Sequence, residues 1–291
     1  MKKRVLILGG NGMIGHNLLL NLEKIFDTKV TLRKDISQYK KYKIFNANNS
    51  FFNLDAKNIS DFYDVIDRFK PNFIINAIGI TKQISNLDIK NTYYVNSEFP
   101  HLISTHLNEV DLMIQLSSDC VFSGKTGFYI ESSIPDAEDD YGKSKAKGEI
   151  FKRNVLTIRK STIGFELSNG HGLFNWWLKS SGKIKGYDNA IYSGITTTQL
   201  SKIIISIIKK NKSIHGLYNI SSEPISKYDL LKFLNKISNR TDLIIEKDTQ
   251  FKCNRSLNGD LFFQTFGILV PNWTKMLTKL WGENSFYELY K

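Results

Sequence analysis

The stretch that decides the fold is Val5-Leu6-Ile7-Leu8-Gly9-Gly10-Asn11-Gly12-Met13-Ile14-Gly15, near the start of the chain. An apolar run leads into glycines spaced Gly-x-x-Gly-x-x-Gly, and an amphipathic segment follows, which predicts a buried strand, a tight turn and a helix. Glycines at such a turn let the backbone approach a pyrophosphate, whose charge is favoured at a helix N-terminus. We therefore expect a dinucleotide here. The expected contacts are Gly9, Gly12, Met13, Ile14 and Gly15.

The first 160 residues alternate short apolar runs with longer helical patterns, which is typical of a parallel sheet with crossover helices. The predicted strands are Val5–Leu8, Val30–Leu32, Ile44–Phe45, Phe73–Ile75, Leu112–Leu116 and Val155–Ile158. The predicted helices are Met13–Phe26, Asp61–Phe69, Phe99–Asn108 and Tyr141–Phe151. Runs that are apolar on both faces suit strands covered by helices on both sides. The fold class is therefore α/β, with a doubly wound parallel sheet of the Rossmann type.

After residue 160 this alternation weakens. A helix at Thr198–Lys210 and a strand at Gly216–Ile220 predict a return to the sheet, whereas the remainder shows its clearest patterns in helices at Tyr228–Ile237 and Trp273–Trp281. We expect a dinucleotide-binding domain of residues 1–160 plus about 195–220. A smaller, mostly helical C-terminal substrate domain would comprise about 161–194 plus 221–291.

Composition narrows the classes of partner. Forty lysines and arginines against 28 aspartates and glutamates give a net charge of +12, which suits nucleic acid, an anionic membrane or a phosphorylated small molecule. The apolar runs are too short to span a membrane or to form a secretory leader. Two cysteines and five histidines without ligand spacing argue against a disulfide framework and a metal site. We expect a cytoplasmic protein that binds a small molecule, and no nucleic acid, membrane or metal.

The residues after the second predicted strand bear on the type of dinucleotide. Sites that prefer NAD usually carry an acidic residue here for the ribose 2′-hydroxyl. Arg33 and Lys34 occupy this place instead and suit a 2′-phosphate, which favours NADP. A solvated basic strand end is the structural alternative. Asp35 follows directly and keeps NAD possible.

Three residues form a candidate catalytic group. Tyr141 and Lys145 lie four residues apart on a predicted helix, so that both side chains share one face. An ammonium close to a phenol lowers the phenol pKa and makes tyrosine a usable proton donor and acceptor. Ser118 follows the strand Leu112–Leu116, where side chains of an open α/β sheet face the ligand crevice. A second Tyr-x-x-x-Lys copy begins at Tyr228 and is expected on a surface helix.

Together with the glycine turn, these residues resemble the extended short-chain dehydrogenases/reductases. The octapeptide Ser117–Gly124 resembles the Ser-Thr-Asp-x-Val-Phe-x-Gly signature of dTDP-4-dehydrorhamnose reductases, with Ser118 in place of the threonine. Asn76-Ala77-Ile78-Gly79 and Leu54-Asp55 resemble the cofactor segments of that family, and Val95-Asn96 resembles a structural pair. The resemblance implies further cofactor contacts by Asp55, Ala77, Ile78, Gly79 and Asn96, together with Tyr141 and Lys145.

A narrower resemblance concerns the substrate. Ile78–Gln83 and Gly172–Thr197 are similar to a subgroup of reductases that act on UDP-linked 2-acetamido-2,6-dideoxy-4-ketohexoses. This implies an NADPH-dependent 4-keto reductase that gives UDP-L-rhamnosamine, whereas the parent family would give dTDP-L-rhamnose. Both products serve deoxysugar and polysaccharide biosynthesis. The implied substrate contacts are Lys82, Asp119, Cys120, Trp177, Lys185, Tyr187 and Arg255. For the last four, lid packing and surface charge are the alternative.

Three alternatives stay open. Cys120 stands two residues after Ser118, as does a cysteine that assists epimerisation in the similar GDP-fucose synthases. A bifunctional epimerase and reductase would need a partner acid, for which His171 is the candidate histidine, and a buried apolar role is the other interpretation of Cys120.

Related 4,6-dehydratases carry glutamate after the aspartate, so dehydration is not expected. A cofactor-binding regulatory subunit is the non-enzymatic alternative, which the intact Ser118, Tyr141 and Lys145 disfavour. A homodimer is left open.

Overall fold

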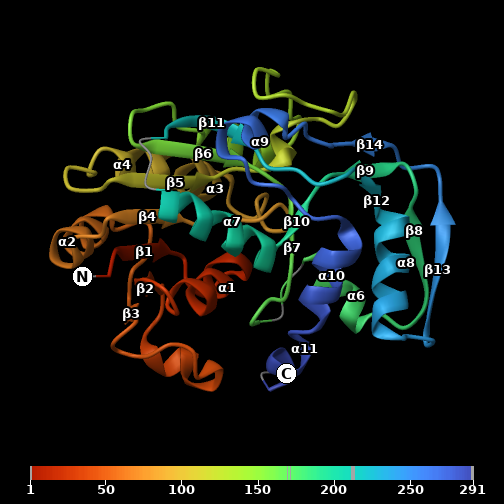
Figure 1. Cartoon of the computed structure of the whole chain (residues 1–291), viewed down its shortest axis with the longest axis horizontal. Coiled ribbons are helices and arrows are strands. Elements are labelled where there is room, and N and C mark those ends of the chain that lie inside the picture. The colour runs from red at the N-terminus through yellow and green to blue at the C-terminus, as the bar shows by residue number, and fades with distance from the viewer. Residues whose placement is uncertain (1, 169, 171, 211–213, 290–291) are drawn as a thin grey trace.

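The computed structural model describes residues 2–168, 170, 172–210 and 214–289, and within them seven parallel strands form the central sheet (Figure 1). Their order across the sheet is β11-β6-β5-β4-β1-β2-β3. Their bounds are β1 (Arg4–Leu8), β2 (Asp27–Thr31), β3 (Ser50–Phe51), β4 (Phe73–Asn76), β5 (Leu112–Leu116), β6 (Val155–Arg159) and β11 (Gly216–Asn219). Chain order reverses between β1 and β4, and ligands of open α/β sheets bind at such a switch point.

Helices cover both faces of this sheet. Their bounds are α1 (Met13–Leu22), α2 (Ile59–Phe69), α3 (Ile89–Tyr93), α4 (Phe99–Ser104), α5 (Asp140–Lys147) and α7 (Thr197–Lys210). Shorter helical turns are η1 (Ile36–Tyr42), the π-helical η2 (Tyr94–Glu98) and η3 (Asp119–Val121).

Alternate residues of β1 point into two separate hydrophobic clusters. Val5 and Ile7 join the cluster under α1 and α7, whereas Leu6 and Leu8 join the cluster under α2 and α4. All four side chains have no exposed surface. Burial on both faces is why these strands are continuously apolar in sequence. The predicted doubly wound parallel sheet is confirmed.

One strand prediction is wrong. Ile44–Phe45 is not a strand; it follows η1, and the Phe45 ring packs edge-on against Tyr39 and Tyr42, with centroid distances of 5.7 and 6.4 Å. The third strand is β3, which pairs with β2 from Ser50 onward. An apolar pair that plugs the end of a core cannot be distinguished from a short strand by periodicity alone.

The C-terminal region is less helical than expected. Its helices are α6 (Leu173–Lys179), α8 (Lys227–Ser238), α9 (Asp260–Phe266), α10 (Trp273–Trp281) and α11 (Asn284–Glu288). Its strands are β7 (Thr162–Ile163), β8 (Gly182–Tyr187), β9 (Ala190–Tyr192), β10 (Ile195–Thr196), β12 (Ile225–Ser226), β13 (Leu243–Asp248) and β14 (Cys253–Asn254). They pair as β10-β7, β12-β9-β14 and β13-β8. The sequence pattern does not predict β13, because half of this strand is charged. The charged residues are accommodated since β13 lies at an exposed edge beside α8 (Figure 1).

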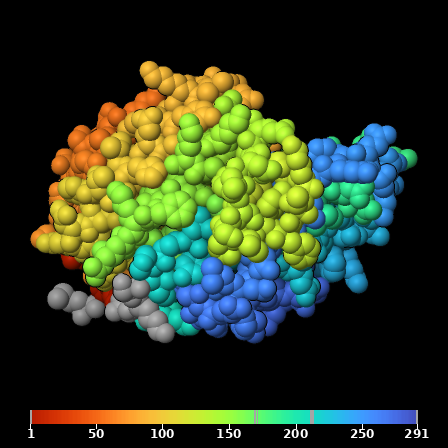
Figure 2. All heavy atoms as spheres, turned by 90° about the horizontal axis from the view of Figure 1, so that it is seen from above, coloured from red at the N-terminus to blue at the C-terminus, as the bar shows by residue number. Residues whose placement is uncertain are grey.

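The chain returns to the main sheet through α7 and β11, as the sequence pattern indicates. Strand β11 pairs with β6, and α7 lies beside α1 (Figure 1). The segment around residue 130 lies against the C-terminal region in the space-filling view (Figure 2), and Tyr129 N–H donates to the Ser256 carbonyl at 3.0 Å. The division into two domains at about residues 160, 195 and 220 stays our proposal.

Among the described residues, no helix combines the length and the apolar character that a membrane crossing requires.

A buried ion pair supports the carboxyl end of the sheet. Arg159 at the end of β6 donates two hydrogen bonds to the Glu149 carboxylate, at 2.8 and 2.7 Å. The Ser117 hydroxyl, which follows β5, donates to the same carboxylate at 2.8 Å. Arg159 and Glu149 are 2% and 5% exposed, so each charge depends on the other for compensation.

Glu149→Gln therefore leaves the Arg159 guanidinium buried without its counter-charge. We expect the free energy of unfolding to fall by about 3–5 kcal/mol, measured by urea denaturation. The matched control is Glu138→Gln, which removes an exposed ion pair with Lys125 and should leave the unfolding curve unchanged. Equal curves for the two variants would contradict a structural role of the buried pair.

Candidate active site

The glycine turn follows β1 at the switch point of the sheet. Gly9 has a φ of +87°, and a Cβ on Gly10 would lie 2.5 Å from the Val30 Cβ, so both are glycine because of the fold itself. A Cβ on Gly15 would collide with the Gly9 carbonyl. Gly12 differs, because its φ is −71° and the only atom that a Cβ would meet within 4 Å is the Gly9 carbonyl oxygen, at 3.5 Å. Open space at the N-cap of α1 fits the close approach of a pyrophosphate.

The segment after β4 runs from the glycine turn toward Lys145. The Ala77 N–H donates to the Leu8 carbonyl at 3.0 Å, and Ile78 packs against Gly9. A Cβ on Gly79 would lie 4.0 Å from the Lys145 Nζ. The predicted cofactor residues Ala77, Ile78 and Gly79 therefore lie between the glycine turn and Lys145.

The Asn96 side chain is hydrogen bonded to the backbone of the loop that follows β4. Its Oδ1 accepts from the Ile80 N–H at 2.8 Å, and its Nδ2 donates to the Ile80 carbonyl at 3.1 Å and to the Ser144 hydroxyl at 3.0 Å. The side chain lies in η2 and is 1% exposed. Asn96 thus fixes the loop after β4 against α5, which agrees with a structural pair and leaves direct cofactor contact as a proposal.

Two basic residues, Arg33 and Lys34, follow β2. Arg33 and Lys34 are both exposed, whereas Asp35 caps η1 and accepts from the Ser37 N–H at 2.9 Å. This engagement makes Asp35 a poorer partner for a ribose hydroxyl than a free carboxylate would be. Asp55 lies beyond β3 and accepts from the Lys57 N–H at 3.0 Å.

Ser118, Tyr141 and Lys145 meet at the carboxyl ends of β5 and β6. Ser118 caps η3, accepting from the Cys120 N–H at 3.1 Å, and it is near enough to Tyr141 to lower the pKa of that phenol. Lys145 lies one turn after Tyr141 in α5, where Asp139 caps the helix by accepting from the Gly142 N–H at 2.8 Å. The Lys145 Nζ donates to the Leu116 carbonyl at 2.8 Å.

The predicted effect of Lys145 on the Tyr141 phenol is wrong for this structure. Burial raises the Tyr141 pKa above its ordinary value of 10.0, and the neighbouring Cys120 and Asp119 raise it further, while the hydrogen bond with Ser118 lowers it. The Lys145 ammonium is instead directed at a backbone carbonyl. Tyr141 is therefore protonated at neutral pH, as a proton donor must be.

Two buried lysines lie near each other. Burial and, to a lesser extent, the positive charge of Lys160 lower the Lys145 pKa to about 7, against the opposing effect of Glu149. Lys160 follows β6, is 8% exposed, and has a pKa lowered by burial to about 8. Sequence reasoning missed Lys160, although a lysine that ends an apolar strand beside β5 is a usable signal.

Asp119 is the acidic centre of this cluster. Its N–H donates to the Lys160 carbonyl at 3.2 Å, and its carboxylate accepts from the Ser118 hydroxyl at 3.2 Å. Burial raises the Asp119 pKa, while Arg255, Ser118 and Lys160 lower it. The Tyr192 hydroxyl on β9 is buried, feels the Asp119 charge, and has no hydrogen-bond partner among the described residues. Tyr192 also went unpredicted, because its approach to Asp119 depends on the folded chain.

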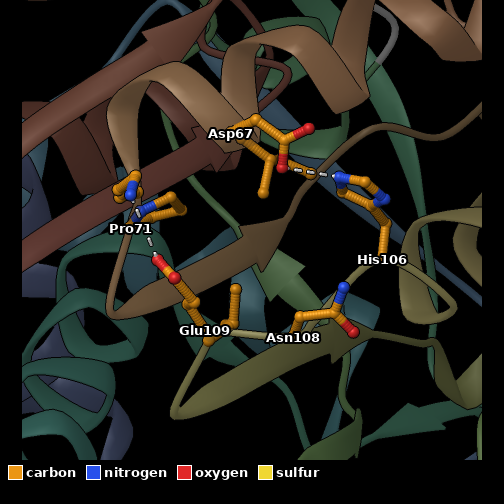
Figure 3. Close-up of a pocket in the computed structure, with 8 residues that line it drawn as sticks. Asp67, Pro71, His106, Asn108 and Glu109 are labelled. Atoms are coloured by element: carbon orange, nitrogen blue, oxygen red, sulfur yellow. Dashed lines mark hydrogen bonds and ion pairs between the residues drawn. The ribbon is translucent and has the colours of Figure 1, made fainter.

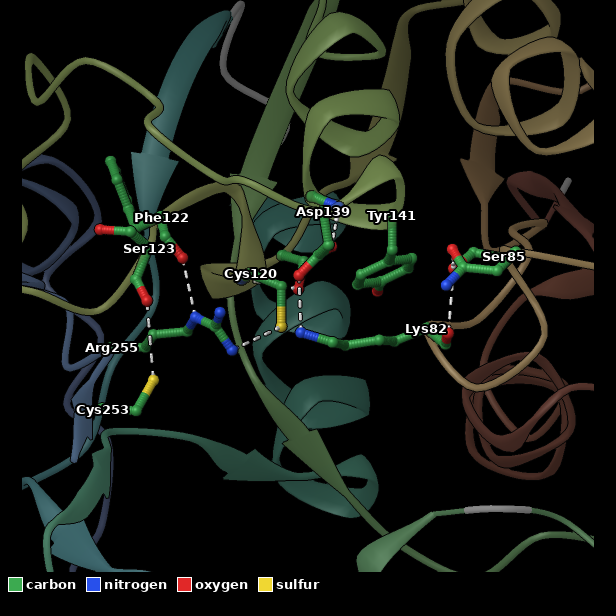
Figure 4. Close-up of polar contacts among 12 residues, drawn as sticks. Lys82, Ser85, Cys120, Phe122, Ser123, Asp139, Tyr141, Cys253 and Arg255 are labelled. Atoms are coloured by element: carbon green, nitrogen blue, oxygen red, sulfur yellow. Dashed lines mark hydrogen bonds and ion pairs between the residues drawn. The ribbon is translucent and has the colours of Figure 1, made fainter. Parts of the chain in front are cut away.

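Two cations approach Cys120 from opposite sides (Figure 4). The Arg255 Nε donates to the Phe122 carbonyl at 2.7 Å, and its Nη1 lies 3.8 Å from the Cys120 Sγ. The Lys82 Nζ forms an ion pair with Asp139 at 2.7 Å. Asp119, Cys120, Lys82 and Arg255, all predicted substrate residues, are therefore brought together around Tyr141.

The environment of Cys120 favours the thiol over the thiolate. Burial and, to a lesser extent, the Asp119 charge raise the Cys120 pKa to about 12, against the opposing effects of Arg255 and Lys82. A thiol with this pKa is a weak base for removing a carbon-bound proton. The other residue considered for epimerisation, His171, lies outside the described residues.

A groove of about 860 Å³ opens beside this cluster. It includes Asp139 and Arg255 from the cluster, and the other lining residues come from the loop after η3, from β9 and from β14: Ser123, Gly124, Lys125, Glu138, Asn189, Ile191, Lys252, Cys253 and Asn254. Strand β9 holds Arg255, which directly follows β14, because the Arg255 N–H donates to the Ile191 carbonyl at 2.9 Å. A guanidinium in the lining of such a groove is suited to phosphate oxygens.

Three predicted substrate residues lie elsewhere. Trp177 is completely buried, donates from Nε1 to the Asn235 Oδ1 at 2.7 Å, and packs against Trp281. This placement contradicts a ligand contact, so we assign Trp177 to the core of the C-terminal region. Lys185 and Tyr187 lie on β8, where Lys185 pairs with Asp248 at 3.4 Å and Tyr187 packs against Phe251. Neither belongs to the groove lining, so both remain predictions without support from this geometry.

A second hollow, of about 280 Å³, lies at the amino ends of β4 and β5 (Figure 3). Its charged groups pair with one another: His106 with Asp67 at 2.8 Å, and Lys70 with Glu109 at 3.7 Å. It is at the opposite edge of the sheet from the glycine turn, and ligands of open α/β sheets bind outside the carboxyl ends.

Comparisons with known proteins agree with this geometry. The curated dTDP-4-dehydrorhamnose reductase of Aggregatibacter actinomycetemcomitans is 30% identical over 307 aligned positions, covering 95% of this chain and 98% of that protein. The solved dTDP-4-dehydrorhamnose reductase of Bacillus anthracis, in complex with NADP, has a TM-score of 0.80 at 21% identity and covers 97% of this chain and 100% of its own.

WbmG of Bordetella bronchiseptica, in complex with NAD and UDP, has a TM-score of 0.77 at 16% identity, covering 100% of this chain and 96% of its own. At such identities the two structures support the fold alone. The family model described as the RmlD substrate binding domain matches residues 2–281. Since that match spans nearly the whole chain, the protein belongs to the RmlD substrate-binding domain family.

Proposed function

We propose that this protein is an NADPH-dependent reductase of nucleotide-linked 4-keto-6-deoxy sugars. The observation that carries the proposal is the position of Ser118, Tyr141 and Lys145, grouped at the carboxyl edge of the sheet near a groove that Arg255 helps to line. The 30% identical relative acts on a sugar nucleotide of this class by its name. The exposed Arg33 and Lys34 favour NADPH over NADH.

The bound NADPH would supply the hydride for the ketone carbon. Tyr141 stays protonated in its buried setting and donates that proton to the ketone oxygen as negative charge develops there. Ser118 donates a hydrogen bond to the same oxygen, which stabilises the developing charge. Lys145, whose ammonium donates to the Leu116 carbonyl, would hold the cofactor ribose.

The substrate that we favour is a UDP-linked 2-acetamido-2,6-dideoxy-L-hexos-4-ulose, which would be reduced to UDP-L-rhamnosamine. It rests on the resemblance of residues 78–83 and 172–197 to that subgroup. The second candidate is dTDP-4-dehydrorhamnose, reduced to dTDP-L-rhamnose, which the relative from A. actinomycetemcomitans favours. In either case Arg255 would contact the diphosphate from its place in the groove lining.

The test is to incubate the protein and NADPH with the dTDP-linked and the UDP-linked 4-keto sugar separately. Loss of NADPH absorbance gives kcat/KM for each, and mass spectrometry with NMR identifies the products. We expect the higher kcat/KM with the UDP-linked amino sugar. A preference for dTDP-4-dehydrorhamnose would select the second candidate. If NADPH is not oxidised with either sugar nucleotide, the proposed reaction is rejected.

Tyr141→Phe removes the proton donor while keeping the ring. We expect kcat to fall by roughly 10²–10⁴-fold while the Kd for NADPH changes by only a few-fold, measured by steady-state kinetics and by NADPH fluorescence. The control is Tyr228→Phe in the other Tyr-x-x-x-Lys copy, where Lys232 and Lys247 lie over the Tyr228 ring far from the groove lining. Full activity in Tyr141→Phe would refute the assignment.

The lowered pKa of Lys145 predicts a pH dependence. A lysine with a pKa of about 7 is an ammonium below that pH and loses its charge as the pH rises, so kcat/KM should fall through this range. Lys160→Met removes a neighbouring positive charge, which raises the Lys145 pKa and moves the falling limb to higher pH. Lys143→Met, an exposed change in α5, should leave the limb in place. A limb that stays fixed in Lys160→Met would contradict the coupling.

Replacing Arg33 and Lys34 together by alanine tests the cofactor preference. Loss of two charged partners of a 2′-phosphate should raise the Kd for NADPH about 10- to 100-fold and leave the Kd for NADH unchanged. Binding is measured by cofactor fluorescence. Lys70→Ala, an exposed lysine at the opposite edge of the sheet, is the control. An equal rise for NADPH and NADH would show that these residues do not read the phosphate.

A further inference from the structure

A histidine connects the glycine turn to the C-terminal helix. His16, in the first turns of α1, has no exposed surface. Its Nδ1 donates to the Gly12 carbonyl at 2.8 Å, and its Nε2 lies 2.8 Å from the Tyr287 hydroxyl in α11. The two residues are 271 positions apart in the sequence. A polar chain therefore runs from the N-cap of α1, through one imidazole, to nearly the end of the described protein.

The protonation of this chain follows from its partners. A backbone carbonyl can only accept, so the His16 Nδ1 must carry a proton. Burial lowers the His16 pKa to about 4, so the ring is neutral near pH 7 and its Nε2 is an acceptor. The Tyr287 hydroxyl therefore donates to Nε2, which fixes the tautomer that donates to Gly12.

The C-terminal end of the chain is itself held firmly. The Tyr287 ring stacks on Phe165 with a centroid distance of 4.1 Å, and it meets the His16 ring edge-on at 5.5 Å. Just before α11, the Glu283 carboxylate accepts from the Thr198 hydroxyl of α7 at 2.7 Å. Tyr287 is 5% exposed, so its hydroxyl is presented to His16 from a packed position.

Gly12 is where this restraint matters. It is the glycine of the turn that its own packing does not require. Its N–H donates to the Gly9 carbonyl at 3.3 Å, and the N–H of the next residue, Met13, belongs to the first turn of α1, where N–H groups lack helical partners. The Gly12 carbonyl accepts both the His16 N–H at 3.2 Å and the His16 Nδ1–H. Two bonds to one carbonyl restrict rotation of the peptide that presents the next N–H to the pyrophosphate.

We infer that His16 and Tyr287 are positioning residues for the cofactor, and that the C-terminal helix α11 sets the affinity of the glycine turn for NADPH. The inference rests on the cofactor part of the proposed function and is independent of which sugar is reduced. It predicts an effect on cofactor binding that a purely structural tyrosine would not have.

Tyr287→Phe is the decisive variant, because it removes the donor and keeps the stacked ring. We expect the Kd for NADPH, measured by nicotinamide fluorescence without sugar, to rise about 5- to 10-fold, the effect of one buried hydrogen bond. The kcat at saturating NADPH and the KM for the sugar nucleotide should stay within about twofold.

His16→Asn is the second variant, because an asparagine amide can still donate to the Gly12 carbonyl but cannot reach Tyr287. It should raise the Kd for NADPH as much as Tyr287→Phe does, and the double variant should add nothing further, since both changes break the same link.

The matched control is Tyr63→Phe, which deletes the hydrogen bond of a half-buried tyrosine, to the Leu102 carbonyl at 3.1 Å between α2 and α4. It should lower the thermal midpoint about as much as Tyr287→Phe and leave the Kd for NADPH unchanged. Equal Kd values in Tyr287→Phe, His16→Asn and wild type would overturn the inference. Failure of the wild type to bind NADPH would instead overturn the proposed function.

Discussion

The parallel pairing of β4 with β1 on one side and β5 on the other is the constraint on which the rest of the site depends. In register, Leu8 of β1 lies beside Asn76 of β4, and Asn76 lies beside Gln115 of β5. The Asn76 amide donates to the Gln115 side chain at 2.8 Å, which reinforces this alignment in the buried sheet. Parallel strands that end at one level must release their following loops at one edge. The glycine turn, the loop of Ala77–Gly79 and the turn at Ser118 meet for that reason.

Charge is concentrated at this edge because the groups compensate one another. Asp119 lies among Lys160, Arg255 and the Ser118 hydroxyl, and each of these favours its charged form against the effect of burial. Burial and the charge of Lys160 lower the Lys145 pKa, the charge of Glu149 raises it, and the resulting pKa is about 7. Such a cluster gains little stability from burial alone. Its retention is consistent with a site that must bind an anionic ligand and move a proton.

A feature of this structure can be predicted from the sequence when it arises from residues that are neighbours along the chain. The glycine turn, the parallel α/β class and the pairing of Tyr141 with Lys145 depend on neighbours along the chain, and the fold bears out the first two. Tyr192 joins the cluster through β9, a strand distant in sequence from Asp119, so no local pattern marks it, whereas Lys160 directly follows an apolar strand and carries a usable local signal. Trp177 was misassigned because an aromatic residue on an amphipathic helix has the same pattern whether it faces the core or a ligand. Tyr141 was assigned the wrong direction of pKa shift because spacing on a helix does not report burial or the actual partner of Lys145.

The glycines of the turn show how a structure separates packing from binding where a motif cannot. Gly9, Gly10 and Gly15 are required by a positive φ or by the atoms already beside them, so the motif would be needed in this fold even without a ligand. Gly12 meets neither condition, and its carbonyl is the one that His16 holds. If open space at Gly12 served only the turn, a restraint that extends to Tyr287 would have nothing to position. Gly12 thus combines open space at its Cβ position with a carbonyl that accepts two hydrogen bonds from His16. These two features at one residue favour a turn that is shaped for a pyrophosphate.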